Sequence, residues 1–196
     1  MLVLASASPR RQELLRNAGI AFTVCPANIP ETPMPEESPN ACAKRLAREK
    51  AEAVFRLDVE DLALGKVGSG KFVLGADTIV LVDDEVLGKP CDPADAARML
   101  RLLSGRSHRV ITGVCLMGKG FADVRSETTT VEMQKLSAEE ILAYVATNEP
   151  MDKAGAYAIQ GWASRWISRI EGDYFNVVGL PVSLVYRMLG ERGALC

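Results

Sequence analysis

Short apolar runs and helix-length amphipathic segments alternate along the chain. Residues 2–6 have the length and composition of a buried strand, and residues 20–24 predict a second strand. Between them, Ser8 and Pro9 are typical of a helix start, with serine as N-cap and proline at the first helical position. This helix is predicted to end at Gly19, because glycine readily adopts the left-handed conformation that closes a helix.

A longer helix is predicted from Ser38-Pro39 to about Arg56, since its apolar residues recur at helical spacing. The segment 26–39 before it is interrupted by proline every few residues and predicts a stiff, irregular loop. Residues 58–71 are predicted as a second loop.

The remaining chain continues this alternation. The pattern predicts strands over 72–82 and 85–87 around an Asp83-Asp84 turn, and then a helix from Asp92-Pro93 to about Ser104. Two strands over about 108–117 and 122–134 follow, and then a capping-box helix from Ser137 to about Thr147. The last predicted elements are short strands over 157–160, 166–170 and 175–178 and a helix from Leu180-Pro181 to Leu189. This mixture predicts the α/β class with a mixed sheet flanked by helices.

Charge, apolar run length and cysteine spacing argue against several classes of protein. The formal net charge of -2 leaves no broad electrostatic footprint for nucleic acid. No apolar run reaches the roughly 18 residues of a membrane span, and the N-terminus lacks a basic signal-peptide region, so we expect a cytoplasmic protein. The five cysteines have no metal or redox spacing and are expected as free thiols. The only histidine, His108, is interpreted as an edge or surface residue.

The segment from Ser6 to Arg11 joins a predicted strand to a predicted helix. Helix N-termini expose unpaired N–H groups and attract anions, whereas arginines there are unfavourable without an anion to answer them. Two interpretations remain open for Arg10 and Arg11: a phosphate site, or a solvated helix start.

Asp77 lies inside an otherwise apolar strand pattern. Buried carboxylates are costly unless they are paired or bound to metal, so Asp77 is either a functional residue or a satisfied structural one. Lys50, Lys89 and Lys153 would each ordinarily be solvated, but Lys89 and Lys153 stand in rigid turn sequences.

A glycine-rich stretch over 65–71 has the spacing of a phosphate-binding P-loop as far as its lysine. Phe72 follows where Ser or Thr should bind magnesium, and the stretch precedes a predicted strand instead of a helix. We therefore interpret it as a surface loop.

Taken together, the motifs resemble the Maf family of nucleoside triphosphate pyrophosphatases over nearly the whole chain. The matching segments, in order, are 5–15, 47–51, 75–80, 88–90, 152–161 and 177–181. The segment 58–71 is longer than the family pattern. The resemblance implies a single domain over 1–196, with two closely packed lobes, a central cleft and a fold similar to inosine triphosphate pyrophosphatases.

The resemblance also implies hydrolysis of the α–β phosphoanhydride bond of a nucleoside triphosphate, dependence on a divalent cation such as Mg²⁺ or Mn²⁺, and often a homodimer. Asp77 matches the family's proton acceptor. Arg10, Thr78 and Gln160 match positions tied to base selectivity, in the pattern of the branch that acts on dTTP and UTP. A sister branch prefers 7-methyl-GTP, and the family name is also associated with regulation of septum formation; both remain alternatives.

The residues can be assigned chemical roles on this basis. Ser8, Arg10 and Arg11 would hold phosphates, whereas Lys50, Lys89 and Lys153 would neutralise the leaving pyrophosphate, which is what phosphoryl chemistry mainly requires. The carboxylates for a metal ion are Glu31 and Asp77. A metal-bound carboxylate is a poorer base, so Asp77 is assigned as the base and Glu31 as the metal or water-positioning ligand.

Overall fold

A computed structural model describes residues 1–63 and 72–195 of the chain. These residues form two compact units. Unit 1 comprises 1–77, 112–127 and 179–196, and unit 2 comprises 78–111 and 128–178. Each unit is thus assembled from segments that are distant in the sequence.

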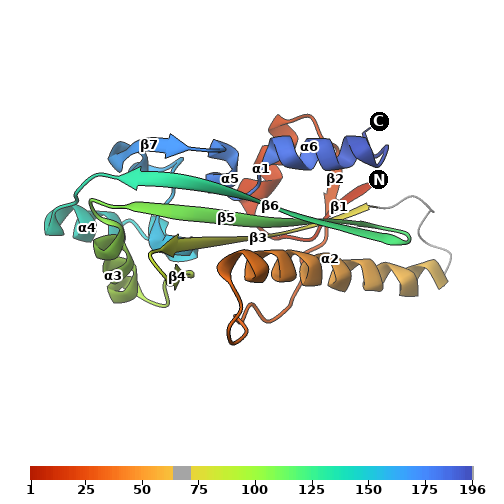
Figure 1. The fold of residues 1–196 in the computed structure, drawn as a ribbon, viewed down its shortest axis with the longest axis horizontal. Helices are drawn as coiled ribbons and strands as arrows, with labels where there is room; N and C mark the ends of the chain where they lie inside the picture. Colours follow the sequence, from red (N-terminus) through yellow and green to blue (C-terminus); the bar gives the residue numbers. More distant parts are fainter. Residues whose placement is uncertain (64–71, 196) are drawn as a thin grey trace. The chain divides into compact units, whose positions relative to one another are not determined.

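The described residues form a seven-stranded sheet in the order β2-β1-β3-β5-β6-β7, with β4 paired to β3 (Figure 1). The strands are β1 (Leu2–Leu4), β2 (Phe22–Val24), β3 (Phe72–Val82), β4 (Glu85–Leu87), β5 (Ser107–Gly118), β6 (Phe121–Met133) and β7 (Ile167–Glu171). β1 pairs in parallel with β2 and β3, whereas β4 pairs antiparallel with β3 and β7 antiparallel with β6. The predicted mixed sheet and α/β class are therefore confirmed.

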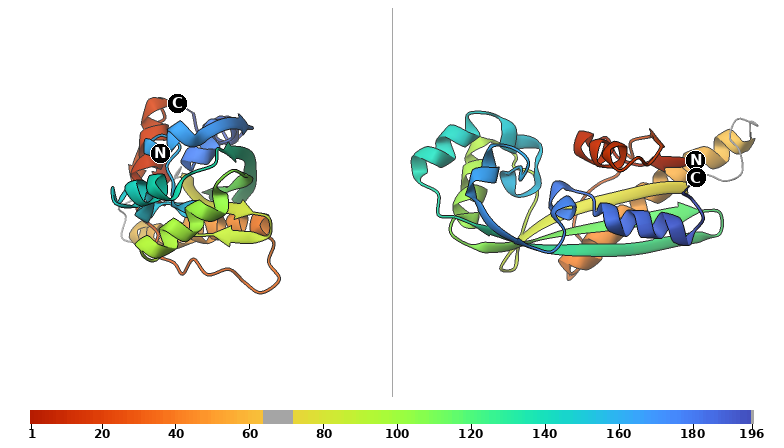
Figure 2. Two further views of the ribbon diagram at one scale, coloured as in Figure 1. Left: turned by 90° about the vertical axis from the view of Figure 1, so that its left-hand side faces the viewer. Right: turned by 90° about the horizontal axis from the view of Figure 1, so that it is seen from above.

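Helices cover both faces of the sheet in unit 1. The helix α2 (Pro39–Ala63) lies on one face, and α1 (Pro9–Asn17) and α6 (Val182–Glu191) lie on the other (Figures 1 and 2). The buried core under α2 includes Ala47, Ala51 and Val54 from the helix, packed with Val3 of β1 and Val73 of β3.

Two glycines bring α2 very close to the strands. A Cβ at Gly75 of β3 would stand 2.0 Å from the Ala47 carbonyl oxygen, and one at Gly113 of β5 would stand 2.2 Å from that of Ala43. Any larger residue at either position would push the helix backbone away. These contacts fix the height of α2 above the sheet in unit 1.

Unit 2 contains shorter helical elements around its part of the sheet. They are α3 (Pro93–Leu103), α4 (Ala138–Val145), α5 (Tyr174–Val178), and the 3-10 helices η1 (Glu149–Asp152), η2 (Ala154–Ala156) and η3 (Trp162–Trp166). The predicted caps are present: the Asp92 side chain accepts from the Asp95 N–H, and Ser137 forms a reciprocal capping box with Glu140. α3 packs against α4 and η2.

The predicted end of α2 was wrong. The helix continues past Arg56 to Ala63, so residues 58–63 are helical and do not form a loop. The physical reason is that no proline or glycine stands between Arg56 and Gly65 to stop the helix. The P-loop-like stretch over 65–71 lies outside the described residues.

Two of the three short strands predicted near the C-terminus were also wrong. Residues 157–160 connect η2 to η3 without forming a strand, and 175–178 belong to α5. α5 begins because the Asp173 carboxylate accepts from the N–H groups of Phe175 and Asn176, a local cap that outweighs the strand propensity of the apolar residues.

The expectation of a surface histidine was wrong as well. His108 is buried in β5, and its Nε2 lies 2.7 Å from the Tyr157 hydroxyl oxygen in unit 2. The contact with the Tyr157 hydroxyl gives one nitrogen of the imidazole a polar partner inside the core. The cysteines that the structure describes, Cys25, Cys42, Cys91 and Cys115, are free thiols, as predicted. Among the described residues, no helix combines the length and apolar character that crossing a membrane requires.

Candidate active site

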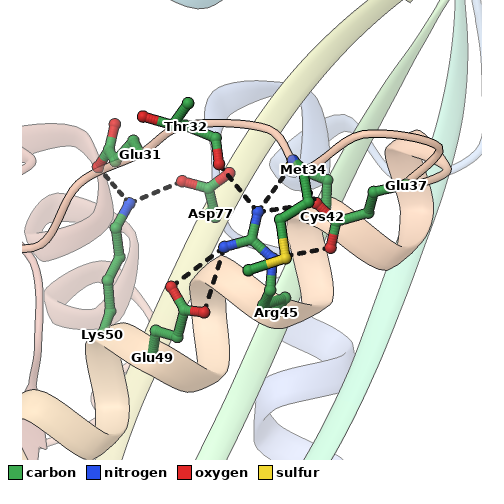
Figure 3. A network of polar contacts seen from close by, with 9 residues as sticks. All are labelled: Glu31, Thr32, Met34, Glu37, Cys42, Arg45, Glu49, Lys50 and Asp77. Atoms are coloured by element: carbon green, nitrogen blue, oxygen red, sulfur yellow. Dashed lines mark hydrogen bonds and ion pairs between the residues drawn. The ribbon is translucent and has the colours of Figure 1, made fainter.

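A buried lysine between two carboxylates forms the centre of the candidate site in unit 1. The Lys50 Nζ lies 2.6 Å from Asp77 Oδ1 and 2.5 Å from Glu31 Oε1 (Figure 3). Lys50 and Asp77 are each only 7% exposed, whereas the Glu31 side chain is 47% exposed. The cluster is therefore buried in unit 1 at Lys50 and Asp77 and reaches solvent at Glu31.

The close approach of α2 to β3 creates this cluster. Residues two apart in a strand share a face, so Asp77 points to the same side as Gly75, toward α2. Gly75 admits the helix at Ala47 and Ala51, and Lys50 stands beside Ala51 in that turn. The small residues on both elements therefore bring the Lys50 ammonium into contact with Asp77.

The donor set of this cluster fits a hard divalent cation. Its two carboxylates are hard oxygen donors that both approach one cationic group, the Lys50 ammonium, and the positive charge of Arg11 also acts on both of them. Among residues 1–63 and 72–195, no group of three or more His, Cys, Asp or Glu could hold a metal ion. Mg²⁺ commonly uses one or two carboxylates, with water and substrate phosphates completing its shell, so two are sufficient.

The turn between β1 and α1 forms the second part of the site. The predicted cap is confirmed, since the Ser8 side chain accepts from the Arg11 N–H and Pro9 takes the first turn. Arg10 is partly exposed in this turn, whereas Arg11 is 8% exposed. The exposed N–H groups of α1 and the two arginines make this end of unit 1 cationic.

The Arg11 guanidinium also ties this turn to the rest of unit 1. It donates to the Gly179 carbonyl (2.8 Å), the Ala76 carbonyl (2.9 Å) and the Ser6 hydroxyl (3.2 Å). Burial lowers the pKa of Arg11, and the negative charges of Asp77 and Glu31 oppose that shift. Because Ala76 precedes Asp77, Arg11 places the α1 N-terminus next to the carboxylate cluster.

The other four predicted site residues belong to unit 2. Thr78 is half-buried in β3, Lys89 and Gln160 are exposed, and the Lys153 ammonium donates to the Glu149 carbonyl and to Asp152. The two turn motifs predicted to carry lysines lie side by side, because the Gly155 N–H donates to the Gly88 carbonyl at 3.0 Å. Gly155 has φ +70° and packs on Val80, so a side chain there would be strained and crowded.

Sequence reasoning missed Arg45, which stands on α2 next to the cluster and contacts four other residues of the network in Figure 3, namely Thr32, Glu37, Cys42 and Glu49. The available signal was the Arg45/Glu49 spacing of four residues, which ordinarily indicates a surface ion pair. It gave no sign of the contacts that Arg45 makes to the preceding loop.

The fold and this site define an α/β protein with a buried lysine–carboxylate centre beside a cationic helix N-terminus. The family model described as "Maf-like protein" matches residues 1–192, and this chain belongs to that family.

Three relatives, all named dTTP/UTP pyrophosphatase, match nearly full length. The protein from Koribacter versatilis (strain Ellin345) is 56% identical over 99% of this chain and 95% of its own length. The protein from Geobacter sulfurreducens is 50% identical, over 99% of this chain and 97% of its own length. The protein from Thermococcus gammatolerans is 48% identical, over 96% and 95% respectively. The predicted family is thereby confirmed.

Proposed function

We propose that this protein is a nucleoside triphosphate pyrophosphatase that hydrolyses dTTP and UTP to the nucleoside monophosphate and pyrophosphate. The observation that carries the proposal is the Lys50 ammonium between Asp77 and Glu31, beside the capped N-terminus of α1. The names of relatives that share about half of its residues support the choice of substrate.

The reaction adds water to phosphorus, breaks the α–β bridging bond and releases pyrophosphate. Asp77 is proposed as the general base that takes the proton of the attacking water. Lys50 donates to Asp77 Oδ1 and so fixes the orientation of that carboxylate. Both side chains are buried, so the base is held in one position before substrate arrives.

Glu31 and Asp77 are proposed to hold a divalent cation, Mg²⁺ or Mn²⁺, together with phosphate oxygens. When bound, such a cation supplies neutralisation of the negative charge on the triphosphate. Since a carboxylate shared with a metal is a poorer base, Glu31, with its half-exposed side chain, is assigned the larger part of that binding.

The remaining predicted residues are assigned to the substrate. Ser8, Arg10 and Arg11 are proposed to bind phosphate oxygens at the N-terminus of α1. Lys89 and Lys153 are proposed to stabilise the charge of the leaving pyrophosphate. Lys50, predicted for the same task, is instead proposed to orient Asp77, because its ammonium contacts Asp77 and Glu31. Thr78 and Gln160 are proposed to hydrogen-bond the pyrimidine edge and so to select the base.

A substrate panel tests the proposal. The purified protein would be incubated with dTTP, UTP, CTP, ATP, GTP and 7-methyl-GTP, with Mg²⁺ or Mn²⁺ or with chelator, and pyrophosphate and orthophosphate measured separately. We expect cation-dependent pyrophosphate release, fastest from dTTP and UTP. Orthophosphate release would place cleavage at the β–γ bond, and preference for 7-methyl-GTP would overturn the roles of Thr78 and Gln160. Binding without turnover would favour a regulatory nucleotide sensor.

A further inference from the structure

Arg45 joins the proline-rich loop before α2 to the helix itself. Its Nε and Nη2 donate to the two carboxylate oxygens of Glu37, each at 2.7 Å. Its Nη2 also donates to the Thr32 carbonyl at 3.1 Å, and its Nη1 donates to Glu49 at 3.2 Å (Figure 3). One planar guanidinium therefore contacts two residues of the loop, Glu37 and Thr32, and two residues of α2, Glu49 and Cys42.

The loop needs such anchoring because it has no strand or helix of its own. Residues 25–38 lie between β2 and α2, and within them the Met34 and Glu37 backbones and the Glu37 carboxylate form a local turn. Thr32, whose carbonyl Arg45 binds, is the residue after Glu31. The backbone on one side of the Glu31 carboxylate is thus fixed by Arg45, while the carboxylate itself meets Lys50.

The Arg45–Glu37 pair is suited to a permanent contact. The side chains are 19% and 11% exposed, and the bidentate geometry is the strongest that arginine offers to a carboxylate. Donation from Arg45 lowers the pKa of Glu37 to about 2, so Glu37 stays ionised across the neutral range. The ion pair between α2 and the loop therefore keeps its charges throughout the neutral pH range.

We propose that Arg45 is a positioning residue for the Glu31 carboxylate: it holds Glu37 and the Thr32 carbonyl so that Glu31 stands beside Lys50 and Asp77. The inference rests on the proposed function and deepens it, because it assigns a task at the same site to a residue outside the predicted set. Arg45 acts through Glu31 and touches neither Asp77 nor the reacting atoms.

The chain offers a matched control on the same helix. Arg48 forms an ion pair with Glu52 four residues further along α2, at 2.8 Å, and the Arg48 side chain is 58% exposed. Its ion pair stays within the helix and involves no residue of the loop. Arg48→Ala therefore removes the same side-chain type from α2 without releasing Glu31.

A double-mutant cycle in pyrophosphate release from dTTP tests the inference. We expect Arg45→Ala to lower kcat about 10- to 100-fold with KM changed less than about 3-fold, and Arg48→Ala to stay within about 2-fold of wild type. In a Glu31→Gln background, Arg45→Ala should cost less than about 2-fold more, because the carboxylate it positions is already gone.

Two results would overturn the inference. If the fold-losses in kcat caused by Arg45→Ala and by Glu31→Gln multiply in the double variant, Arg45 does not act through Glu31. A loss of folded protein in Arg45→Ala would give the same multiplication. The cycle therefore separates positioning of Glu31 from general destabilisation. If Arg45→Ala matches Arg48→Ala in kcat, Arg45 is a surface ion pair only.

Amide hydrogen exchange tests whether Arg45 anchors the loop, and it requires no catalytic activity. We expect faster exchange over residues 31–37 in Arg45→Ala than in Arg48→Ala, with β3 unchanged in both. Equal exchange over 31–37 in the two variants would overturn the inference. A wild-type protein that releases no pyrophosphate would instead refute the proposed function, and exchange would still report whether Arg45 holds the loop.

Discussion

A charged cluster buried in unit 1 contrasts with a neutral pair buried in unit 2. In unit 1 the buried groups Lys50, Asp77 and Arg11 occur as complementary charges in mutual proximity. In unit 2 the buried His108 and Tyr157 are held neutral: burial lowers the pKa of His108 to about 4 and raises that of Tyr157. Their rings meet edge to face with centroids 5.3 Å apart.

The difference supports the base and cation roles proposed for the charged residues of unit 1. Moving an ion out of water costs several kcal/mol, which pairing repays only when its geometry is good, and apolar residues often fill the same space at equal or lower cost. A retained charged cluster therefore points to a reaction, whereas the neutral His108–Tyr157 pair only needs to fill and orient a core. Four variants would break or sharpen this contrast.

The largest effect is expected for Asp77→Asn in unit 1. The amide cannot accept the proton of water and leaves Lys50 with Glu31 as its carboxylate partner, so kcat for pyrophosphate release should fall about 10²- to 10⁴-fold. Asp83→Asn is the control, because Asp83 is an exposed turn residue paired with Arg106 and has a positive φ that asparagine tolerates. More than a tenth of wild-type activity in Asp77→Asn would remove Asp77 from the base role.

Gly75→Ala should break the same region through its packing. The new methyl would meet the Ala47 carbonyl oxygen at 2.0 Å and the Ala51 nitrogen at 2.8 Å, which are backbone atoms that cannot turn aside. We expect a loss of about 3–5 kcal/mol in the free energy of unfolding, measured by urea denaturation. Gly190→Ala, whose methyl meets Leu195 at an ordinary 3.5 Å inside α6, should be neutral or stabilising. Equal stability of the two variants would contradict the close approach of α2.

The neutral pair in unit 2 predicts a pH dependence. Because the folded-state pKa of His108, about 4, is below the unfolded value of about 6.5, the unfolded chain binds the proton first as pH falls. This group therefore lowers the free energy of unfolding by about 2 kcal/mol between pH 7 and pH 5. In His108→Gln the free energy of unfolding should lose this part of its pH dependence. Urea titrations of both proteins at pH 7 and at pH 5 would measure the change. Identical pH slopes in both proteins would mean that His108 is not held neutral.

The smallest effect is expected for Tyr144→Phe. The Tyr144 hydroxyl donates to Glu149 at 2.8 Å and accepts from the Ala158 N–H at 3.1 Å, so its removal leaves a backbone donor without that partner. We expect a loss of about 1–2 kcal/mol in thermal or urea unfolding. Tyr186→Phe, on a residue that is 56% exposed, should change stability by less than about 0.5 kcal/mol. A Tyr144→Phe variant as stable as Tyr186→Phe would show that this buried polar network is energetically neutral.

Most of the elements could be predicted because local chemistry fixes them. The Ser8 and Ser137 caps, the Asp83-Asp84 turn and the apolar run that forms β3 all depend on a few neighbouring residues, and the structure confirms each. The errors occurred where local signals were weak or misleading: α2 lacks a stop signal, and the apolar residues after Asp173 favour a strand until the aspartate cap is seen.

The sequence by itself determined the helix caps, the longer strands, the family and the set of charged residues from which a site could be built. Only the tertiary structure decided that Lys50 meets both Asp77, 27 residues further along the chain, and Glu31 in the preceding loop. It also decided that Arg45 anchors that loop and that His108 is buried. The physical reason is that caps and turns depend on neighbours in sequence, whereas these contacts depend on how closely α2 packs on the sheet at Gly75 and Gly113.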